Sequence, residues 1–142
     1  MIELTNGHKF DFACASGALA FDGRGWPWEW PVRWSGNLRP EEMTIVAKTV
    51  TMHARKGNLR WWHPWTCFRL LPFGNAVNAI GLTNPGIEYW IKHCYPVARR
   101  KGYKIAASLM PNDVREATLM GKMLNPLSLA YIEVNISCPN LG

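Results

Sequence analysis

Short apolar runs along the chain predict a series of strands separated by turns and loops. Residues 2–4 and 9–12 flank the turn sequence Thr-Asn-Gly-His, which is typical of a small β-hairpin. Residues 12–17 then have the pattern of a buried strand, and this strand ends on the small residues Ala-Ser-Gly at 15–17. Small side chains at a strand end allow a ligand to approach the backbone closely.

The rest of the chain predicts an alternation of strands and helices. Residues 44–47 form an apolar run that fits a strand buried on both faces, with Lys48 at its carboxyl end. The later predicted elements are an amphipathic helix over 87–100, a strand over 104–109, a helix over 113–124 and a strand over 129–136. Strands that alternate with helices predict an α/β fold with a parallel sheet.

Two aromatic segments have neither the helical nor the strand period. Residues 26–34 carry four tryptophans together with Pro27 and Pro31, and these prolines exclude a central strand because each lacks an amide donor. We predict a semi-rigid loop whose indoles pack onto the surface of the domain, with stacking on a ligand or partner as the alternative. Residues 52–74, which contain Trp61, Trp62 and Trp65, predict a long binding loop or lid.

Composition narrows the class of protein. The chain has 142 residues, of which 48% are hydrophobic and 18% charged, as in a globular domain. It is shorter than the roughly 250 residues of a closed eight-stranded α/β barrel. The four cysteines form no C-x-x-C pair, which argues against a zinc site or a disulfide framework. Without a signal-peptide pattern or an apolar run of about 18 residues, the sequence predicts a cytoplasmic protein without a membrane span.

The positive charge of the chain is concentrated in one interval. The formal net charge is +6, and no acidic residue occurs between Glu42 and Glu88. That interval contains the basic residues Lys48, Arg55, Lys56, Arg60 and Arg69. Such a concentration indicates an anionic partner, for example a phosphate, a carboxylate or a nucleic acid, and a solvated basic face is the alternative.

Polar and small residues gather where the predicted strands end. They are Ser16, Gly17, Lys48, Thr49, Asn78, Ser108, Asn135 and Cys138. This set supplies a cation, neutral hydrogen-bonding groups and a thiol, but no pair of carboxylates for hydrolysis. A cysteine on such a loop can act as a nucleophile, a metal ligand or a proton-transfer group, and an inert buried thiol is the alternative.

Several sequence motifs resemble those of one enzyme family. The segment Asn-Ile-Ser-Cys-Pro-Asn at 135–140 resembles the catalytic loop of the class 1 dihydroorotate dehydrogenases, flavoproteins of pyrimidine synthesis. The segments at 15–17, 47–51, 55–58 and 78–86 resemble successive motifs of the same family, in order and at compatible spacing. The resemblance therefore covers nearly the whole chain.

The resemblance implies both a fold and a reaction. The expected fold is the N-terminal half of a (β/α)8 TIM barrel preceded by a β-hairpin. Residues 1–142 would then be a partial FMN-binding domain with the hairpin and strands one to four. The implied reaction is the oxidation of dihydroorotate to orotate in de novo synthesis of UMP. We expect a half barrel to be poorly soluble, to hold flavin weakly and to be inactive alone.

The resemblance also implies roles for individual residues. The residues implied to contact FMN are Ser16, Gly17, Lys48, Thr49, Ser108 and Asn135. Those implied to contact the substrate are Lys48, Asn78, Ala79, Ile80, Gly81, Leu82, Asn135 and Asn140. Cys138 matches the catalytic base, which takes a proton from dihydroorotate while hydride moves to N5 of the flavin. No metal is implied.

The implied partners leave alternatives open. The electron acceptor could be fumarate, in a homodimer, or NAD through a second subunit that carries FAD and an iron–sulfur cluster. A related flavin oxidoreductase that acts on another cyclic amide or pyrimidine is one alternative function, with the tryptophan-rich loops reshaping its pocket. A nucleic-acid-binding module is another, in which Arg55, Arg60, Arg69 and the nearby tryptophans form a basic stacking surface. We favour the oxidoreductase, with no nucleic acid and no membrane among its partners.

Overall fold

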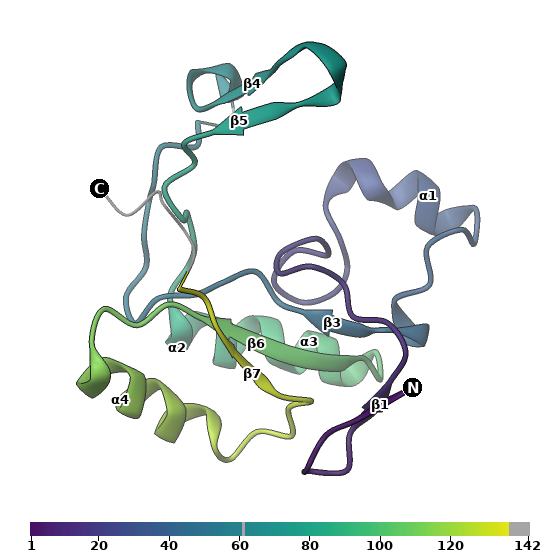
Figure 1. Cartoon of the computed structure of the whole chain (residues 1–142), viewed down its shortest axis with the longest axis vertical. Coiled ribbons are helices and arrows are strands. Elements are labelled where there is room, and N and C mark those ends of the chain that lie inside the picture. The colour runs from purple at the N-terminus through teal and green to yellow at the C-terminus, as the bar shows by residue number, and fades with distance from the viewer. Residues whose placement is uncertain (61, 137–142) are drawn as a thin grey trace.

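A parallel sheet lies at the centre of the computed structural model, which describes residues 1–60 and 62–136. Its strands are β3 (Thr44–Val46), β6 (Lys104–Leu109) and β7 (Ile132–Val134), in the order β3-β6-β7 (Figure 1). Ile45 pairs with Ile105, and Ser108 pairs with Glu133. The predicted α/β class and the parallel sheet are therefore confirmed, although β7 is shorter than the predicted strand over 129–136.

The predicted helix over 87–100 forms in three pieces. They are α2 (Ile87–Tyr89), a π-helical turn (Trp90–Cys94) and α3 (Tyr95–Arg100). The amide of Tyr95 donates to the carbonyl of Trp90, five residues earlier, instead of four. Pro96 explains the wide turn, since its ring would collide with the carbonyl four residues back in a regular α-helix.

The predicted helix over 113–124 is confirmed as α4 (Val114–Leu124). Asp113 caps its first turn, because the carboxylate accepts a hydrogen bond of 2.7 Å from the amide of Glu116. Gly121 and the polar side chains of this helix do not interrupt its buried stripe, which contains Met120 and Leu124.

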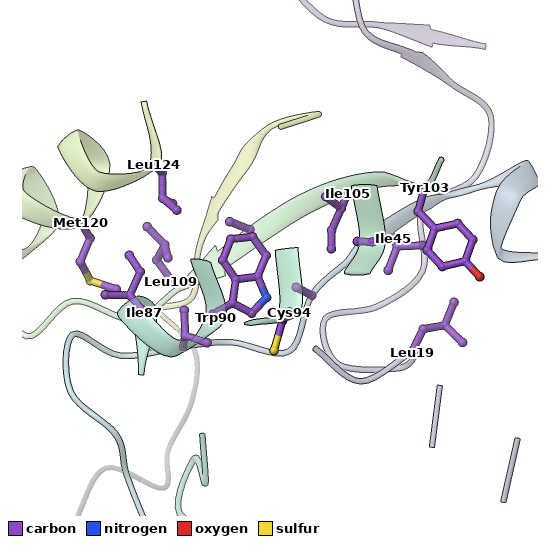
Figure 2. Close-up of a cluster of buried hydrophobic side chains, with 14 residues drawn as sticks. Leu19, Ile45, Ile87, Trp90, Cys94, Tyr103, Ile105, Leu109, Met120 and Leu124 are labelled. Carbon is purple, nitrogen blue, oxygen red and sulfur yellow. The ribbon is translucent and has the colours of Figure 1, made fainter. Parts of the chain in front are cut away.

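The hydrophobic core lies between the sheet and these helices. Trp90 is completely buried at its centre, and its indole nitrogen donates to the carbonyl of Phe21 at 2.7 Å (Figure 2). Ile105 and Leu109 of β6 face this core, whereas Ala106 packs with Val46 in a second cluster. The alternation along β6 follows from the two-residue period of a strand, which sends successive side chains to opposite faces.

The N-terminal segment lies across the amino ends of the central strands. β1 (Ile2–Glu3) pairs with β2 (Lys9–Phe10) in an antiparallel ladder. His8 hydrogen-bonds the hydroxyl of Thr44 at 2.9 Å, and the amide of Asn6 donates to the carbonyl of Ala130 at 2.8 Å. These contacts leave the opposite, carboxyl end of the sheet available for a site.

The predicted buried strand over 12–17 is wrong in extent. Only one parallel bridge forms there, between Ala13 and Thr44, and the side chain of Phe12 is 74% exposed. The amide of Gly17 still donates to the carbonyl of Val46 at 3.2 Å. The segment thus runs beside β3 and leaves it at Gly17, whose positive φ of 78° turns the chain away.

The tryptophan-rich segment is helical, contrary to the predicted loop. It forms a 3₁₀ turn (Pro27–Glu29) followed by α1 (Trp30–Trp34). Both prolines lie in the first turn of their element, where no intrahelical amide donor is needed. The expected packing of all four indoles is also wrong, because the side chains of Trp28 and Trp34 are 65% and 78% exposed.

The predicted long loop over 52–74 contains the first strand of a projecting hairpin. β4 (Phe68–Leu70) and β5 (Ala76–Asn78) pair in an antiparallel ladder that extends away from the central sheet (Figure 1). All residues of both strands are exposed, so neither shows the burial pattern that would identify a strand. The remaining 3₁₀ turns are Pro40–Glu42, Pro64–Thr66 and Pro72–Gly74.

Candidate active site at the strand ends

Side chains from four separate segments meet at the carboxyl end of the sheet. The hydroxyl of Thr49 lies at the centre of this group. Its oxygen is 3.1 Å from the hydroxyl of Ser16, 2.9 Å from that of Ser108 and 3.1 Å from the side-chain amide of Asn135. Thr49 and Ser108 are buried, so each of these contacts replaces a hydrogen bond to water.

Glu133 determines which of these hydroxyl groups donate and which accept hydrogen bonds. Its carboxylate accepts a hydrogen bond of 2.8 Å from the hydroxyl of Ser108. A hydroxyl carries one proton, so Ser108 accepts from Thr49, which is then the acceptor for the amide of Asn135. We call Ser16, Thr49, Ser108, Glu133 and Asn135 the strand-end network. The carboxylate acceptor therefore fixes the direction in which Ser108 and Thr49 donate, whereas the hydroxyl of Ser16 has a second acceptor in a backbone carbonyl at 3.1 Å.

Lys48 is held against the first of these segments. Its amide donates to the carbonyl of Ala20 at 2.8 Å, and its side chain is half-buried. A Cβ atom at Gly17 would lie 3.1 Å from Cγ of Lys48. The absence of a side chain at Gly17 therefore lets the lysine stem lie directly against the backbone of the first strand end.

The predicted substrate segment over 78–82 lies on a separate loop. The amide of Asn58 donates to the carbonyl of Ile80, and its side-chain amide donates to that of Ala79, both at 2.9 Å. Gly57 faces the same segment so closely that a Cβ atom would lie 2.5 Å from the oxygen of Ile80. The motifs at 55–58 and 78–86 thus form one double loop.

Asn84 joins this double loop to the second strand end. Its side chain is buried, and its oxygen accepts from the amides of Thr51 and Gly86 at 3.1 and 2.9 Å. Its nitrogen donates to the carbonyl of Leu82 at 2.7 Å. One asparagine therefore fixes the residues that follow Thr49 relative to the segment over 78–82.

The structure brings some of the predicted site residues together and separates others. Ser16, Thr49, Ser108 and Asn135 share one network, with Gly17 and Lys48 beside it. The segment over 78–82 makes its backbone contacts with Asn58 instead. Cys138 and Asn140 lie outside the described residues.

The basic residues of the interval between Glu42 and Glu88 lie in different parts of the structure. Lys56 and Arg60 line an open hollow of about 530 Å³ beside the double loop. Arg55 takes part in a backbone bridge with Asn84, and Arg69 lies on the exposed strand β4. Two of the basic residues therefore contribute positive charge to one hollow, as expected for an anionic partner.

Sequence reasoning missed two residues of this region. Glu133 is the acceptor of the strand-end network, and Gly57 permits the close contact between the two loops. An acidic residue within an otherwise apolar strand could have indicated Glu133. A single glycine, in contrast, carries no signal of what it will contact.

Residues 1–60 and 62–136 contain neither a metal centre nor a membrane-spanning helix. Among residues 1–60 and 62–136, no group of three or more histidine, cysteine or acidic side chains could hold a metal ion. No helix in this part of the chain is long and apolar enough to cross a membrane.

The sheet and its site define a class of protein. Parallel strands that place polar side chains at their carboxyl ends are the arrangement in which α/β proteins build ligand sites. The sequence profile of the dihydroorotate dehydrogenase family matches residues 40–142. The chain belongs to this family, which confirms the resemblance found in its motifs.

Individual relatives agree with this assignment. The chain is 33% identical over 98 residues to the protein named dihydroorotate dehydrogenase B (NAD(+)), catalytic subunit, of Phocaeicola vulgatus, and 37% identical to that of Desulforudis audaxviator. Each match covers 68% of this chain and 30% of the relative. The protein of the same name from Petrotoga mobilis is 32% identical over 127 residues, 89% of this chain and 38% of the relative. The chain thus spans about a third of the length of these relatives.

Proposed function

We propose that the chain takes part in the FMN-dependent oxidation of dihydroorotate to orotate, in de novo synthesis of UMP. The observation that carries this proposal is the strand-end network, in a chain that belongs to the dihydroorotate dehydrogenase family. The family match favours an oxidoreductase over the nucleic-acid-binding module that the basic residues also suggested. No carboxylate pair for hydrolysis lies in the network, whose only acidic member is Glu133.

The strand-end residues fit the ring of a flavin. That ring presents carbonyl oxygens and ring nitrogens, which need neutral donors and acceptors together with a nearby cation. Ser16 is exposed and Asn135 is half-buried, so both can offer neutral groups, and Lys48 offers the cation. Thr49 and Ser108 are buried behind them and would hold Ser16 and Asn135 in place. Gly17 lets the stem of Lys48 lie against the backbone at this strand end. These residues would hold FMN, which when bound accepts hydride at its N5 atom.

The substrate is a cyclic amide with a carboxylate. Lys48 and Asn135 would contact it from the strand ends, and the segment over 78–82 would contact it from the double loop, with Asn140 as a further polar contact. The left-handed backbone at Gly81 and Leu82, with φ values of 72° and 55°, gives this segment a fixed shape. Positive charge near this loop favours the carboxylate of the substrate.

Cys138 would move the proton of the reaction. As hydride leaves one ring carbon of dihydroorotate, a proton must leave the adjacent carbon, and a thiolate three residues after Asn135 can accept it. Asn135 is held by Thr49, which fixes the start of the segment that carries this thiol. The strand-end network thus holds the residue that starts the catalytic-loop motif over 135–140.

We further propose that the chain contributes the hairpin and the first four strands of a (β/α)8 barrel. The order of parallel strands and the site at their carboxyl ends support this arrangement. The names of the relatives, which specify NAD(+) and a catalytic subunit, favour NAD as the electron acceptor through a second subunit. We propose that this second subunit carries FAD and an iron–sulfur cluster and that the complex is cytoplasmic. A homodimer of the catalytic subunit is compatible with this complex.

The test is flavin reduction by dihydroorotate in the complete protein that contains this chain. We expect Cys138→Ala to retain FMN and to slow flavin reduction by about 10²- to 10⁴-fold, the usual contribution of a general base. Stopped-flow measurement of flavin bleaching gives the rate, and the absorbance spectrum gives the FMN content. Cys14→Ala is the matched control, because Cys14 is a half-buried thiol in the N-terminal segment, where its amide donates to the carbonyl of Thr44 in β3. Reduction of Cys138→Ala at the original rate would refute the role of base.

A further inference from the structure

The helical tryptophan segment and the helix that follows the double loop enclose an open pocket of about 800 Å³. We call it the aromatic pocket. Its aromatic lining consists of Phe21, Trp26, Trp30, Trp34 and Tyr89. No member of the strand-end network lines it, so it is a different site from the one proposed for flavin and substrate.

The indoles of α1 present unburied ring surface to this pocket. The side chains of Trp30 and Trp34 are 43% and 78% exposed, and their ring centroids are 6.4 Å apart at a tilt of 40°. An indole that is exposed to water does not contribute the favourable free energy of burial to folding. Groups of exposed aromatic residues are therefore typical of interaction sites. Two adjacent indoles provide faces on which another flat ring can stack.

Trp26 forms the fixed wall of the pocket. Its indole nitrogen donates to the carbonyl of Gly17 at 3.0 Å, and its ring stacks on Trp28 with centroids 5.4 Å apart and planes 9° apart. This wall is therefore rigid and preformed, whereas Trp34 has few contacts to give up when a ligand binds. Preformed pockets bind without first ordering their walls.

The charged side chains of the pocket favour an anion. The carboxylate of Asp22 is occupied by Arg24, through hydrogen bonds of 3.0 Å from its amide and 2.8 Å from Nε. The terminal guanidinium nitrogens of Arg24 and the ammonium group of Lys101 have no partner among the described residues. Both side chains are exposed. With Arg33, three cations and one acidic group line the pocket.

The other titratable groups at the pocket do not offset this charge. Arg33 is engaged in the fold, since it donates to the carbonyl of Arg24 at 3.1 Å and lies 5.6 Å from the ring of Tyr103. Cys94 lies in the floor, and burial raises the pKa of its thiol to about 11. The thiol is neutral at pH 7, so it adds no negative charge to the pocket. The exposed cationic ends of Arg24 and Lys101 can therefore attract an anionic ligand.

We propose that the aromatic pocket binds a nucleoside monophosphate. The base stacks on the indoles of Trp30 and Trp34, and the phosphate is held by Arg24 and Lys101. A flat ring with an attached anion matches the two features that the pocket combines, a stacking surface and exposed cationic groups in excess over its one carboxylate. The pocket is also within the usual size of small-ligand sites, about 300–1,000 Å³.

The test is titration of the complete protein that contains this chain with AMP and UMP at micromolar protein concentration. We expect saturable quenching of tryptophan fluorescence, with weaker binding at high salt because the contacts are charged. Trp34→Ala should raise the Kd by about tenfold through the lost stacking, and Lys101→Ala should raise it and reduce the salt dependence. Adenosine and inorganic phosphate, which each lack one of the two recognised groups, should bind at least tenfold more weakly.

Matched variants separate this site from others. Trp62→Ala removes an equally exposed indole, and Lys122→Ala removes an exposed lysine near a helix end, and neither residue lines the pocket. Both should keep the original Kd. Binding that falls in Lys48→Ala but persists in Lys101→Ala would assign the nucleotide to the proposed flavin site and refute the proposal. Absence of saturable binding up to millimolar AMP and UMP would refute it as well, whatever the outcome for FMN and dihydroorotate.

Discussion

At the scale of residues, the candidate site depends on where the protons of three hydroxyl groups lie. Ser108 donates to the carboxylate of Glu133, which makes Ser108 an acceptor for Thr49 and leaves Thr49 as the acceptor for Asn135. Neutral hydroxyls alone could reverse their hydrogen bonds at little cost. A terminal carboxylate cannot donate when ionised, so it removes that freedom.

This role of Glu133 leads to a prediction about stability. Glu133→Ala removes the acceptor of a hydroxyl that is only 1% exposed, so the free energy of unfolding should fall by about 1–3 kcal/mol. Urea unfolding followed by circular dichroism measures this loss. Glu41→Ala, at an exposed position, is the control and should stay within about 0.5 kcal/mol of the original chain. An equal change in both variants would contradict the ordering role.

Some of these site residues could be predicted from the sequence. Ser16, Thr49, Ser108 and Asn135 were selected because each follows or ends a predicted strand, and the structure joins all four. Glu133 was missed although an acidic residue in an apolar run is a signal, because the sequence does not show which hydroxyl of a neighbouring strand its carboxylate meets. Contacts between segments depend on the register in which neighbouring strands pair, and a local sequence pattern does not determine that register.

At the scale of elements, the double loop depends on a glycine with no side chain. Gly57 has a φ of 57°, and a Cβ atom there would lie 2.5 Å from the carbonyl oxygen of Ile80 and even closer to the hydroxyl of Thr83. Such separations are far below van der Waals contact. The motif at 55–58 can therefore lie against 79–83 only with glycine at this position.

A glycine with the same sign of φ but no neighbours provides a matched comparison. Gly36 has a φ of 78°, and nothing lies within 4 Å of its Cβ position. Gly36→Ala should cost about 1 kcal/mol for the left-handed backbone alone, and Gly57→Ala should cost about 2 kcal/mol or more through the added collision. Urea unfolding measures both, and limited proteolysis of the loops should accelerate only in Gly57→Ala. Equal losses would show that the close contact does not matter.

The sequence predicted some of the helices and strands correctly and others wrongly. The strand over 104–109 and the helix over 113–124 match the structure, because each buries one stripe of a regular pattern. The tryptophan segment did not, since prolines in the first turns of helical elements resemble prolines in a loop. β4 and β5 are exposed throughout, so no burial pattern identified their hairpin.

At the scale of the whole molecule, apolar surface remains open on the described part of the chain. The side chains of Ile132 and Val134 on β7 are 44% and 54% exposed, and β7 lies at the edge of the sheet. Leu70 and Phe73 add exposed apolar groups on the projecting hairpin. An open strand edge with apolar side chains is a surface on which protein chains associate.

We therefore expect the isolated chain of 142 residues to self-associate as its concentration rises. Size-exclusion chromatography with light scattering measures the mass of the species formed. Val134→Thr should shift association to higher concentration, because it makes the exposed face of β7 more polar. Val114→Thr changes an 84% exposed valine on α4 and should leave association unchanged. A single monomeric mass at every concentration would contradict this expectation.

The sequence by itself determined the α/β class, the parallel sheet, the capped helix α4 and the family, together with the strand-end residues from which the site is built. These features follow from local patterns of burial and from short motifs, which a single segment carries. Only the tertiary structure decided the direction of the strand-end network, the contact of Gly57 with the loop over 79–83, and the aromatic pocket. Each of these depends on the distance between atoms of segments that are far apart in the chain, and that distance is set by packing of the whole fold.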